Sequence, residues 1–436
     1  MHKVDDLEFL STPGPVTLVL LPDFKNRKAH ALPKHDPNAR LKEAVGLAHA
    51  IRLNVRQAEI ISIRRILPAT LFGKGVMARL KGFIEHEEIT LVVIHASLGP
   101  VQQRNLEKAL GCKVIDRTGL ILEIFGERAR TFEGRLQVEL AALTYQRSRL
   151  VRSWTHLERQ RGGLGFIGGP GETQLEVDRR LISSRITRLR QELESVKRTR
   201  EMQRKARKKV PYPVVALVGY TNAGKSTLFN KLTNSDVIAK DILFATLDPT
   251  MRALKLASGR TIILSDTVGF ISELPTQLVA AFRATLEEVL EADLLIHVRD
   301  ISHADTQSQC QDVLQVLKEL GLEEDVKSHM IEALNKIDTL DVEHQALLPQ
   351  NENAIPISAL TGDGLIKLLE MIDKRLGKDE SIAKFKLDLS DGAAVAWLYA
   401  HGEVLERREV KLKIDLKVRL SPANIQRFEK QFLSVS

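Results

Sequence analysis

The eight residues 219–226 constrain the fold more than any other part of the chain, because they read Gly-Tyr-Thr-Asn-Ala-Gly-Lys-Ser. This G-x-x-x-x-G-K-S motif follows the apolar run 214–218, typical of a buried strand, and precedes a helix predicted over 227–232. Its glycines let backbone N–H groups surround a phosphate where the helix begins. Lys225 is expected to neutralise the β- and γ-phosphates, and Ser226 to bind Mg²⁺. The motif predicts a nucleoside triphosphate site in a mostly parallel sheet with helices on both faces.

Two further segments are expected to respond to the γ-phosphate. Asp266-Thr-Val-Gly269 follows a strand predicted over 261–265, so Asp266 can hold the magnesium shell while the amide of Gly269 senses the phosphate. Upstream, the loop 244–250 offers Thr246 as a second magnesium hydroxyl that closes over the γ-phosphate and is released after hydrolysis. A turn threonine before Asp-Pro is the structural alternative. The candidate catalytic residues are Lys225, Thr246, Asp266 and Gly269, and the candidate magnesium ligands are Ser226 and Thr246.

Two motifs at the ends of later predicted strands indicate guanine. In Asn335-Lys336-Ile-Asp338, the Asp338 carboxylate can accept hydrogen bonds from the guanine N1–H and exocyclic amine, which adenine does not offer in that arrangement. Leaving that carboxylate buried and unpaired is costly, so adenine should be rejected. In Ser358-Ala-Leu360, a backbone amide can meet the guanine oxygen. The predicted GTP-binding residues are Gly219, Tyr220, Thr221, Asn222, Ala223, Gly224, Lys225, Ser226, Thr227, Phe244, Ala245, Thr246, Leu247, Asp248, Asp266, Thr267, Val268, Gly269, Asn335, Lys336, Asp338, Ser358, Ala359 and Leu360.

Phe270 occupies the position after Asp-x-x-Gly where many GTPases place a glutamine that orients the attacking water. A phenyl ring cannot do this, so we expect slow intrinsic turnover and a partner that orders the site. Asn222, in the phosphate-binding loop, could help to hold a potassium ion (K⁺) near the phosphates. Equal rates in sodium and potassium would exclude that role.

The net charge of +8 is unevenly distributed along the chain. Residues 145–210 carry 18 lysines and arginines against 7 acidic residues, whereas residues 213–376 carry 14 against 24. A basic segment beside an acidic domain predicts a polyanionic partner, either nucleic acid or an anionic membrane surface. The helices of the basic segment have a narrow apolar seam that suits a partner helix better than lipid, so peripheral membrane association is the lesser alternative.

No apolar run approaches the roughly 20 residues needed to span a bilayer, and the start lacks a signal-peptide pattern. We therefore expect a cytoplasmic protein without an integral membrane segment, and a monomer. The cysteines Cys112 and Cys310 lie in different predicted domains, so thiols are expected rather than a disulfide.

The first half of the chain predicts an α/β domain followed by a helical arm. Residues 1–133 alternate predicted strands and helices, which favours a mainly parallel sheet. Residues 134–209 contain two helices with heptad spacing, expected to fold into a long antiparallel hairpin. Their connection over 161–171 contains six glycines, which serve either as a flexible turn or as a bare backbone tip that meets a partner.

The second half predicts the nucleotide domain over 213–376 and a small α+β domain over 384–436. The pattern of the last domain predicts a helix, a strand over 410–414, a strand over 416–420 and a helix. It contains no chemical motif.

Together these stretches resemble the HflX family of ribosome-associated GTPases, within the Obg-related group. The resemblance is most specific over Lys-Val-Ile-Asp-Arg-Thr-Gly at 113–119, Arg-Ser-Trp-Thr-His-Leu-Glu-Arg-Gln at 152–160 and Gly-Gly-Pro-Gly-Glu-Thr-Gln at 168–174. The phosphate-binding loop and the segments 244–250 and 266–270 match as well, whereas the C-terminal part matches weakly.

The resemblance implies a GTPase that binds the large (50S) ribosomal subunit and dissociates or rescues stalled ribosomes, notably under stress. It also implies that the glycine-rich loop reaches ribosomal RNA. Many members carry an arginine just before Gly-Pro-Gly, where this chain has Ile167-Gly168-Gly169, so the tip contacts should differ. A GTPase acting in ribosome assembly or on another RNA is the alternative. The hypothetical RNA-contacting residues are Gly162, Gly163, Gly165, Gly168, Gly169, Gly171, Arg179 and Arg180.

Overall fold

The chain folds into two compact units in a computed structural model. The first unit comprises residues 1–193, 240–247 and 273–283, and the second comprises 194–239, 248–272 and 284–436. The described residues are 14–24, 35–160, 174–207, 212–235, 243–244, 246–247, 249–272, 288–322, 329–377, 381–410, 413–420 and 422–433. Within these ranges, no helix combines the length and the apolar character that crossing a membrane requires.

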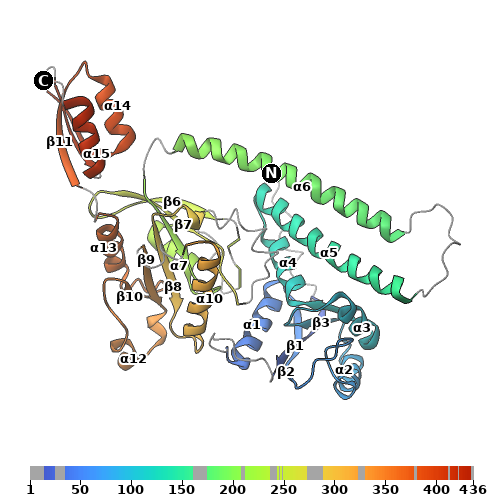
Figure 1. The fold of residues 1–436 in the computed structure, drawn as a ribbon. Coiled ribbons are helices and arrows are strands. Elements are labelled where there is room, and N and C mark those ends of the chain that lie inside the picture. Colours follow the sequence, from blue (N-terminus) through green and yellow to red (C-terminus); the bar gives the residue numbers. More distant parts are fainter. Residues whose placement is uncertain are drawn as a thin grey trace, which may run out of the picture. The chain divides into compact units, whose positions relative to one another are not determined.

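The first unit is built on a parallel sheet with the strand order β2-β1-β3-β4. Its strands are β1 (Val16–Phe24), β2 (Asn54–Ile63), β3 (Leu91–Ile94) and β4 (Lys113–Asp116). The helices that alternate with them are α1 (Pro37–Ala50), α2 (Lys74–His86), α3 (Pro100–Leu110) and α4 (Arg117–Arg128). The predicted parallel α/β arrangement is confirmed (Figure 1). It forms because alternating strands and amphipathic helices bury their apolar sides against one another.

Two long helices follow, α5 (Phe132–Gln160) and α6 (Gln174–Arg207), and they lie side by side as the heptad pattern predicts (Figure 1). On α6, Ile186 and Leu189 are 1% and 0% exposed, so the apolar seam is buried. Arg185 of α6 forms an ion pair with Glu139 of α5 at 2.8 Å. The connecting residues 161–173, with all the glycines of the predicted tip, lie outside the described residues.

Asp116, at the end of β4, joins α5 to the sheet. Its fully buried carboxylate accepts a hydrogen bond from the Gly119 amide at 2.8 Å, which caps α4. The same carboxylate accepts from Arg149 at 2.6 Å and from the Tyr145 hydroxyl at 2.5 Å, both on α5. A buried carboxylate is tolerated here because it is fully paired.

The second unit contains a six-stranded sheet, as far as the described residues show, with the order β10-β9-β8-β5-β7-β6. All its pairings are parallel except that of β6 with β7. The strands are β5 (Val214–Val218), β6 (Thr250–Lys255), β7 (Thr261–Asp266), β8 (Leu294–Asp300), β9 (Met330–Asn335) and β10 (Ala354–Pro356). The helices are α7 (Lys225–Thr233), α10 (Thr306–Glu319), α12 (Val342–Ala346) and α13 (Leu365–Leu376).

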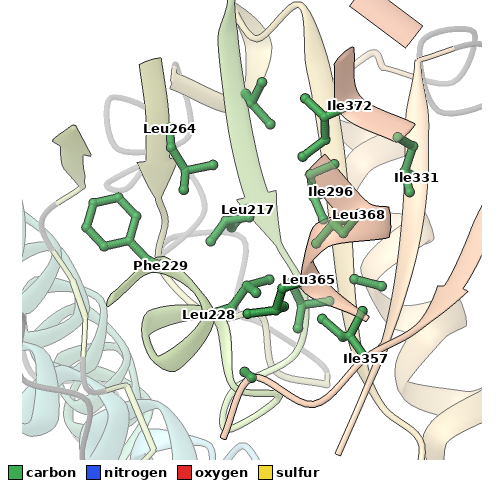
Figure 2. Close-up of a cluster of buried hydrophobic side chains, with 14 of the residues drawn as sticks. Leu217, Leu228, Phe229, Leu264, Ile296, Ile331, Ile357, Leu365, Leu368 and Ile372 are labelled. Carbon is green, nitrogen blue, oxygen red and sulfur yellow. The ribbon is translucent and has the colours of Figure 1, made fainter. Parts of the chain in front are cut away.

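The core of this sheet fixes the strand ends that carry the nucleotide motifs. Leu217 of β5, Leu228 of α7 and Ile296 of β8 are buried in one apolar cluster, shown in Figure 2. Leu368 and Ile372 of α13 complete the same cluster (Figure 2). Because the buried apolar runs are only a few residues long, the polar residues that follow them emerge at the carboxyl edge of the sheet.

The C-terminal part of the second unit is α+β, as predicted, but its elements differ from the prediction. It consists of β11 (Ser381–Asp388), α14 (Gly392–His401), β12 (Glu403–Val410), β13 (Lys413–Leu420), α15 (Pro422–Phe428) and a short helix η3 (Glu429–Leu433). The sheet order is β11-β13-β12. The predicted strand 416–420 lies within β13, but β13 begins earlier, at Lys413, because its alternation of apolar and charged residues continues without a break. The predicted strand 410–414 is misplaced, because β12 ends at Val410. The strand β11 shows the same alternation and was missed.

Candidate nucleotide-binding site

The phosphate-binding loop between β5 and α7 depends on two glycines. Gly219 has φ +152°, and a Cβ there would lie 2.2 Å from the carbonyl oxygen of Val298. Gly224 has φ +93°, and a Cβ there would lie 2.2 Å from Nδ2 of Asn335. Both positions therefore require glycine, since no side chain fits and φ is positive at each. The loop ends directly at the start of α7, where backbone N–H groups can meet an anion.

Lys225 lies inside this loop rather than on the surface. It is 6% exposed, and its Nζ donates hydrogen bonds to the carbonyl oxygens of Gly219 at 3.1 Å and Tyr220 at 2.7 Å. Burial lowers the pKa of Lys225 to about 8, and the Asp266 carboxylate partly opposes that shift. The ammonium group is therefore held where the motif predicts contact with phosphate oxygens.

Ser226 and Asp266 form the candidate magnesium site. The Ser226 hydroxyl donates a hydrogen bond to Oδ2 of Asp266 at 2.7 Å, and Asp266 is fully buried at the end of β7. A hydroxyl and a carboxylate are hard oxygen ligands, which suit Mg²⁺. The pair therefore fits the ion that a nucleoside triphosphate brings with it, either by direct contact or through water. Thr267 supports this geometry by donating from its hydroxyl to the Leu217 carbonyl at 2.6 Å.

The segment that follows Asp266 is joined to the phosphate-binding loop. The Thr221 amide donates to the Phe270 carbonyl at 2.7 Å, and the Phe270 amide donates to the Gly219 carbonyl at 3.0 Å. The Ser272 amide donates to the Tyr220 hydroxyl at 2.8 Å. A Cβ on Gly269 would lie 2.9 Å from Cα of Thr221 and 3.0 Å from Nζ of Lys225, so this glycine lies against the loop.

The side chain of Phe270 is only 2% exposed. A phenyl ring offers no hydrogen bond to water, and its burial indicates that it anchors the segment. The expectation that Phe270 does not orient water is thus consistent with its burial.

Asn335, at the end of β9, holds the guanine motifs together. Its Nδ2 donates to the Ala223 carbonyl at 2.8 Å, and its Oδ1 accepts from the Ala359 amide at 2.9 Å. The Ser358 hydroxyl donates to Oδ1 of Asp338 at 2.6 Å. The phosphate-binding loop, the Asn-Lys-x-Asp motif and the Ser-Ala-Leu motif therefore meet at one edge of the sheet. Such convergence is what a base pocket requires.

The Asp338 side chain is exposed in this structure, so its pairing with a base stays a prediction. It lies in the short helix η2 (Ile337–Thr339), which follows β9 and contains no buried residue. Ser358 fixes one of its oxygens, and the carboxylate has further lone pairs for a base. The side chain of Leu360 is 71% exposed.

Asp300 is a residue of this site that sequence reasoning missed. Its Oδ2 forms an ion pair with Nζ of Lys336 at 2.6 Å, and Lys336 has φ +70°. The contact fixes a lysine whose backbone lies in a region that side-chain-bearing residues rarely adopt. The available signal was the one that identified Asp266, because Asp300 also ends an apolar strand at the carboxyl edge.

Thr246, the other candidate magnesium ligand, belongs to the first unit by its contacts. In this unit Phe244 is 2% exposed and its ring meets that of Phe125 on α4, edge to face, with centroids 4.8 Å apart. Leu247 is also buried, whereas Thr246 is half-buried. Ala245 and Asp248 lie outside the described residues. Since Ser226 and Asp266 belong to the second unit, a shared magnesium contact with Thr246 stays a prediction.

Of the hypothetical RNA-contacting residues, Arg179 and Arg180 are exposed on α6. The glycines Gly162, Gly163, Gly165, Gly168, Gly169 and Gly171 fall outside the described residues. The RNA contacts therefore remain predictions.

Four family models match consecutive parts of the chain. They are described as GTP-binding GTPase N-terminal (residues 38–126), GTP-binding GTPase Middle Region (128–207), 50S ribosome-binding GTPase (214–336) and HflX C-terminal domain (344–435). The last match extends the resemblance through the C-terminal part, where sequence inspection found it weak.

Curated relatives match over most of their own length. A protein named GTPase HflX from Magnetococcus marinus is 51% identical over 392 residues, covering 89% of this chain and 90% of that protein. GTPase HflX from Escherichia coli is 43% identical over 369 residues, covering 84% and 85%. Among solved structures, SsGBP in complex with GDP is 26% identical, covers 83% of this chain and 98% of its own, and has a TM-score of 0.47. The family assignment rests on the sequence matches.

Proposed function

Because the chain belongs to the HflX family and is a GTP-hydrolysing enzyme, we propose that it binds the large (50S) ribosomal subunit and dissociates or rescues stalled ribosomes under stress. The observation that carries this proposal is the match of residues 214–336 to a model described as that of a 50S ribosome-binding GTPase. The excess of basic residues over 145–210 supports an RNA-bearing partner. The protein is proposed to act in the cytoplasm as a monomer.

In the proposed reaction, Lys225 neutralises charge on the β- and γ-phosphates, and the amide of Gly269 donates to the γ-phosphate. Ser226 and Thr246 would hold Mg²⁺, with Asp266 in its shell, and the ion would neutralise negative charge on the phosphates. The hydrogen bond of 2.7 Å between Ser226 and Asp266 supports this role for these two residues. The side chain at position 270 offers no hydrogen bond to the attacking water, so hydrolysis is slow until the ribosome orders the site. A potassium ion at Asn222 is a further element of this proposal.

The segments that respond to GTP are proposed to control the basic helical hairpin at 134–209, called the arm here. Ordering of 244–250 and 266–275 by GTP favours the complex with the large subunit, and hydrolysis reverses it. The alternative, a role in ribosome assembly or on another RNA, uses the same basic surface and differs in the particle that is bound.

Cosedimentation with separated ribosomal subunits tests the proposal. We expect the full chain to pellet with 50S subunits in a non-hydrolysable GTP analogue and much less in GDP. Binding to small subunits or to precursor RNA instead would favour the alternative, and no nucleotide-dependent binding would contradict both.

A second experiment tests the arm. Replacing the glycines Gly168 and Gly169 by alanine should weaken 50S binding and ribosome splitting without changing intrinsic GTP hydrolysis. A matched control is Leu347→Ala, an exposed position of the second unit. Unchanged binding and splitting in the glycine variant would exclude the arm as the contact.

A further inference from the structure

Three side chains with metal-ligating atoms meet on one face of the nucleotide-domain sheet. His297 of β8, Cys310 of α10 and Glu332 of β9 each offer one ligand atom, and these atoms lie within 4.8 Å of one another. The two strands are paired in register, with His297 beside Glu332, so both side chains leave the sheet on the same side. Cys310 reaches them from the helix that packs on that face.

His297 is a buried side chain on this face of the sheet. It is 1% exposed, and its Nδ1 finds no hydrogen-bond partner within the described part of the chain. Burial, with Arg299 and Lys225, lowers the pKa of His297 to about 3, so the imidazole is neutral. A buried ring nitrogen without a partner costs free energy, and a neutral imidazole with an unused nitrogen is the form that binds metal ions.

The other two residues complete a mixed sulfur, nitrogen and oxygen set. Burial, reinforced by Glu332 and opposed by Arg299, raises the pKa of the Cys310 thiol, which therefore keeps its proton until a cation displaces it. Glu332 forms an ion pair with Arg299 at 2.7 Å. That contact uses only part of the hydrogen-bonding capacity of a carboxylate, so Glu332 can also bind a cation.

We infer that His297, Cys310 and Glu332 form a binding site for Zn²⁺ in the nucleotide domain. Zinc prefers tetrahedral sites made of thiolate, imidazole and carboxylate, whereas Mg²⁺ avoids sulfur. Bond lengths of roughly 2.0–2.3 Å place tetrahedral ligand atoms about 3.3–3.8 Å apart, so the widest pair, at up to 4.8 Å, must close by at most about 1–1.5 Å. A movement of that size requires rotation of the Cys310 and Glu332 side chains about their χ torsions.

The charges around the site are compatible with a dication. Thiolate and carboxylate contribute two negative charges, and Arg299 contributes one positive charge beside Glu332. The site is distinct from the magnesium site at Ser226 and Asp266, but it borders the phosphate-binding loop, since His297 pairs with Val218 just before Gly219. A bound ion joins α10 to β8 and β9 and so stabilises the strand that pairs with β5 just before the phosphate-binding loop.

The experiment uses the full chain with GDP and Mg²⁺ bound, and Co²⁺ as a spectroscopic substitute for zinc. We expect a thiolate-to-cobalt charge-transfer band in the near ultraviolet that saturates at one equivalent. Cobalt at the magnesium site gives no such band, because the residues there carry no sulfur. The band should vanish in Cys310→Ser and persist in Cys112→Ser, the matched control at the chain's other cysteine.

Thermal unfolding provides a second readout. Zn²⁺ should raise the Tm of the wild type and of Cys112→Ser but not that of Cys310→Ser, whose Tm without metal shows that it folds. His297→Asn and Glu332→Gln should each weaken cobalt binding. No band in the wild type, or a band unaffected by Cys310→Ser, would overturn the site and leave the proposed ribosomal function untouched.

Discussion

Nδ2 of Asn335 lies 2.8 Å from the carbonyl oxygen of Ala223, so the residue that opens the base motif also holds the phosphate-binding loop. The same side chain therefore holds both the phosphate-binding loop and the Ser-Ala-Leu motif in place. The close approach of the same amide to Gly224 explains why that position tolerates no side chain.

Asn335→Ala should weaken nucleotide binding strongly. The change leaves the Ala223 carbonyl and the Ala359 amide without their partner, and each buried group left unpaired costs about 1–3 kcal/mol. We predict a loss of GDP affinity of roughly 10- to 100-fold, measured with a fluorescent GDP analogue. Leu347→Ala, at an exposed site, should bind as the wild type does. Equal affinity in both variants would show that this junction is unimportant.

Asp338→Asn should change the base that is selected. The amide can still accept from Ser358 but offers an N–H where guanine also offers one, whereas xanthine presents a carbonyl there. Loss of two charge-assisted hydrogen bonds predicts a fall in GTP affinity of roughly 100- to 1,000-fold, with a gain for xanthosine triphosphate. Competition binding with the two nucleotides measures the change. Retained preference for GTP would remove Asp338 from the base site.

Phe270→Gln should not accelerate intrinsic hydrolysis, although it restores the glutamine that many GTPases carry. Position 270 is 2% exposed and its backbone is bonded to the loop, so the amide would be buried rather than presented to water. Burying an amide and losing the ring should cost about 1–3 kcal/mol, which lowers Tm. Single-turnover rates and thermal unfolding measure both effects. A faster rate with an unchanged Tm would mean that the side chain can reach the phosphate.

The pKa of Lys225 predicts a specific pH dependence of stability. In the folded protein without nucleotide this pKa is about 8, below the ordinary value of 10.5. The unfolded chain therefore holds more protons between these two pH values, and the burial penalty fades as pH rises through that window. Relative to Lys225→Met, the wild type should gain Tm from pH 8 to pH 10.5. A Tm difference that stays constant across that range would contradict the burial of the charged amine.

The motif residues that the sequence singles out come together in the structure because the motifs are local. Gly219, Lys225, Asp266 and Asn335 each belong to a short motif at the end of an apolar strand, and parallel strands bring their carboxyl ends to one edge. Asp300 also ends an apolar strand, but its role depends on a long-range ion pair with Lys336 that the strand position alone does not reveal.

The elements that were missed or misplaced are those with ambiguous patterns. The sequence pattern indicates strands at 16–21, 59–63 and 91–96 but not β4, which has only four residues and leads directly into α4, so that a period of two cannot be recognised. The predicted boundary between the strands 410–414 and 416–420 falls at Asp415, inside the regular alternation of β13. The grouping of Phe244 with the first unit could not be predicted either, because the contact with Phe125 joins residues far apart in the chain.

The rate of GTP hydrolysis with and without purified 50S subunits tests the central claim most directly. With Phe270 buried, the isolated protein should turn over slowly, and 50S subunits should raise its rate about tenfold for each ~1.4 kcal/mol by which they stabilise the transition state. The account predicts a saturable rise with 50S subunits and little change with small subunits. A rate that is independent of added 50S subunits would contradict it.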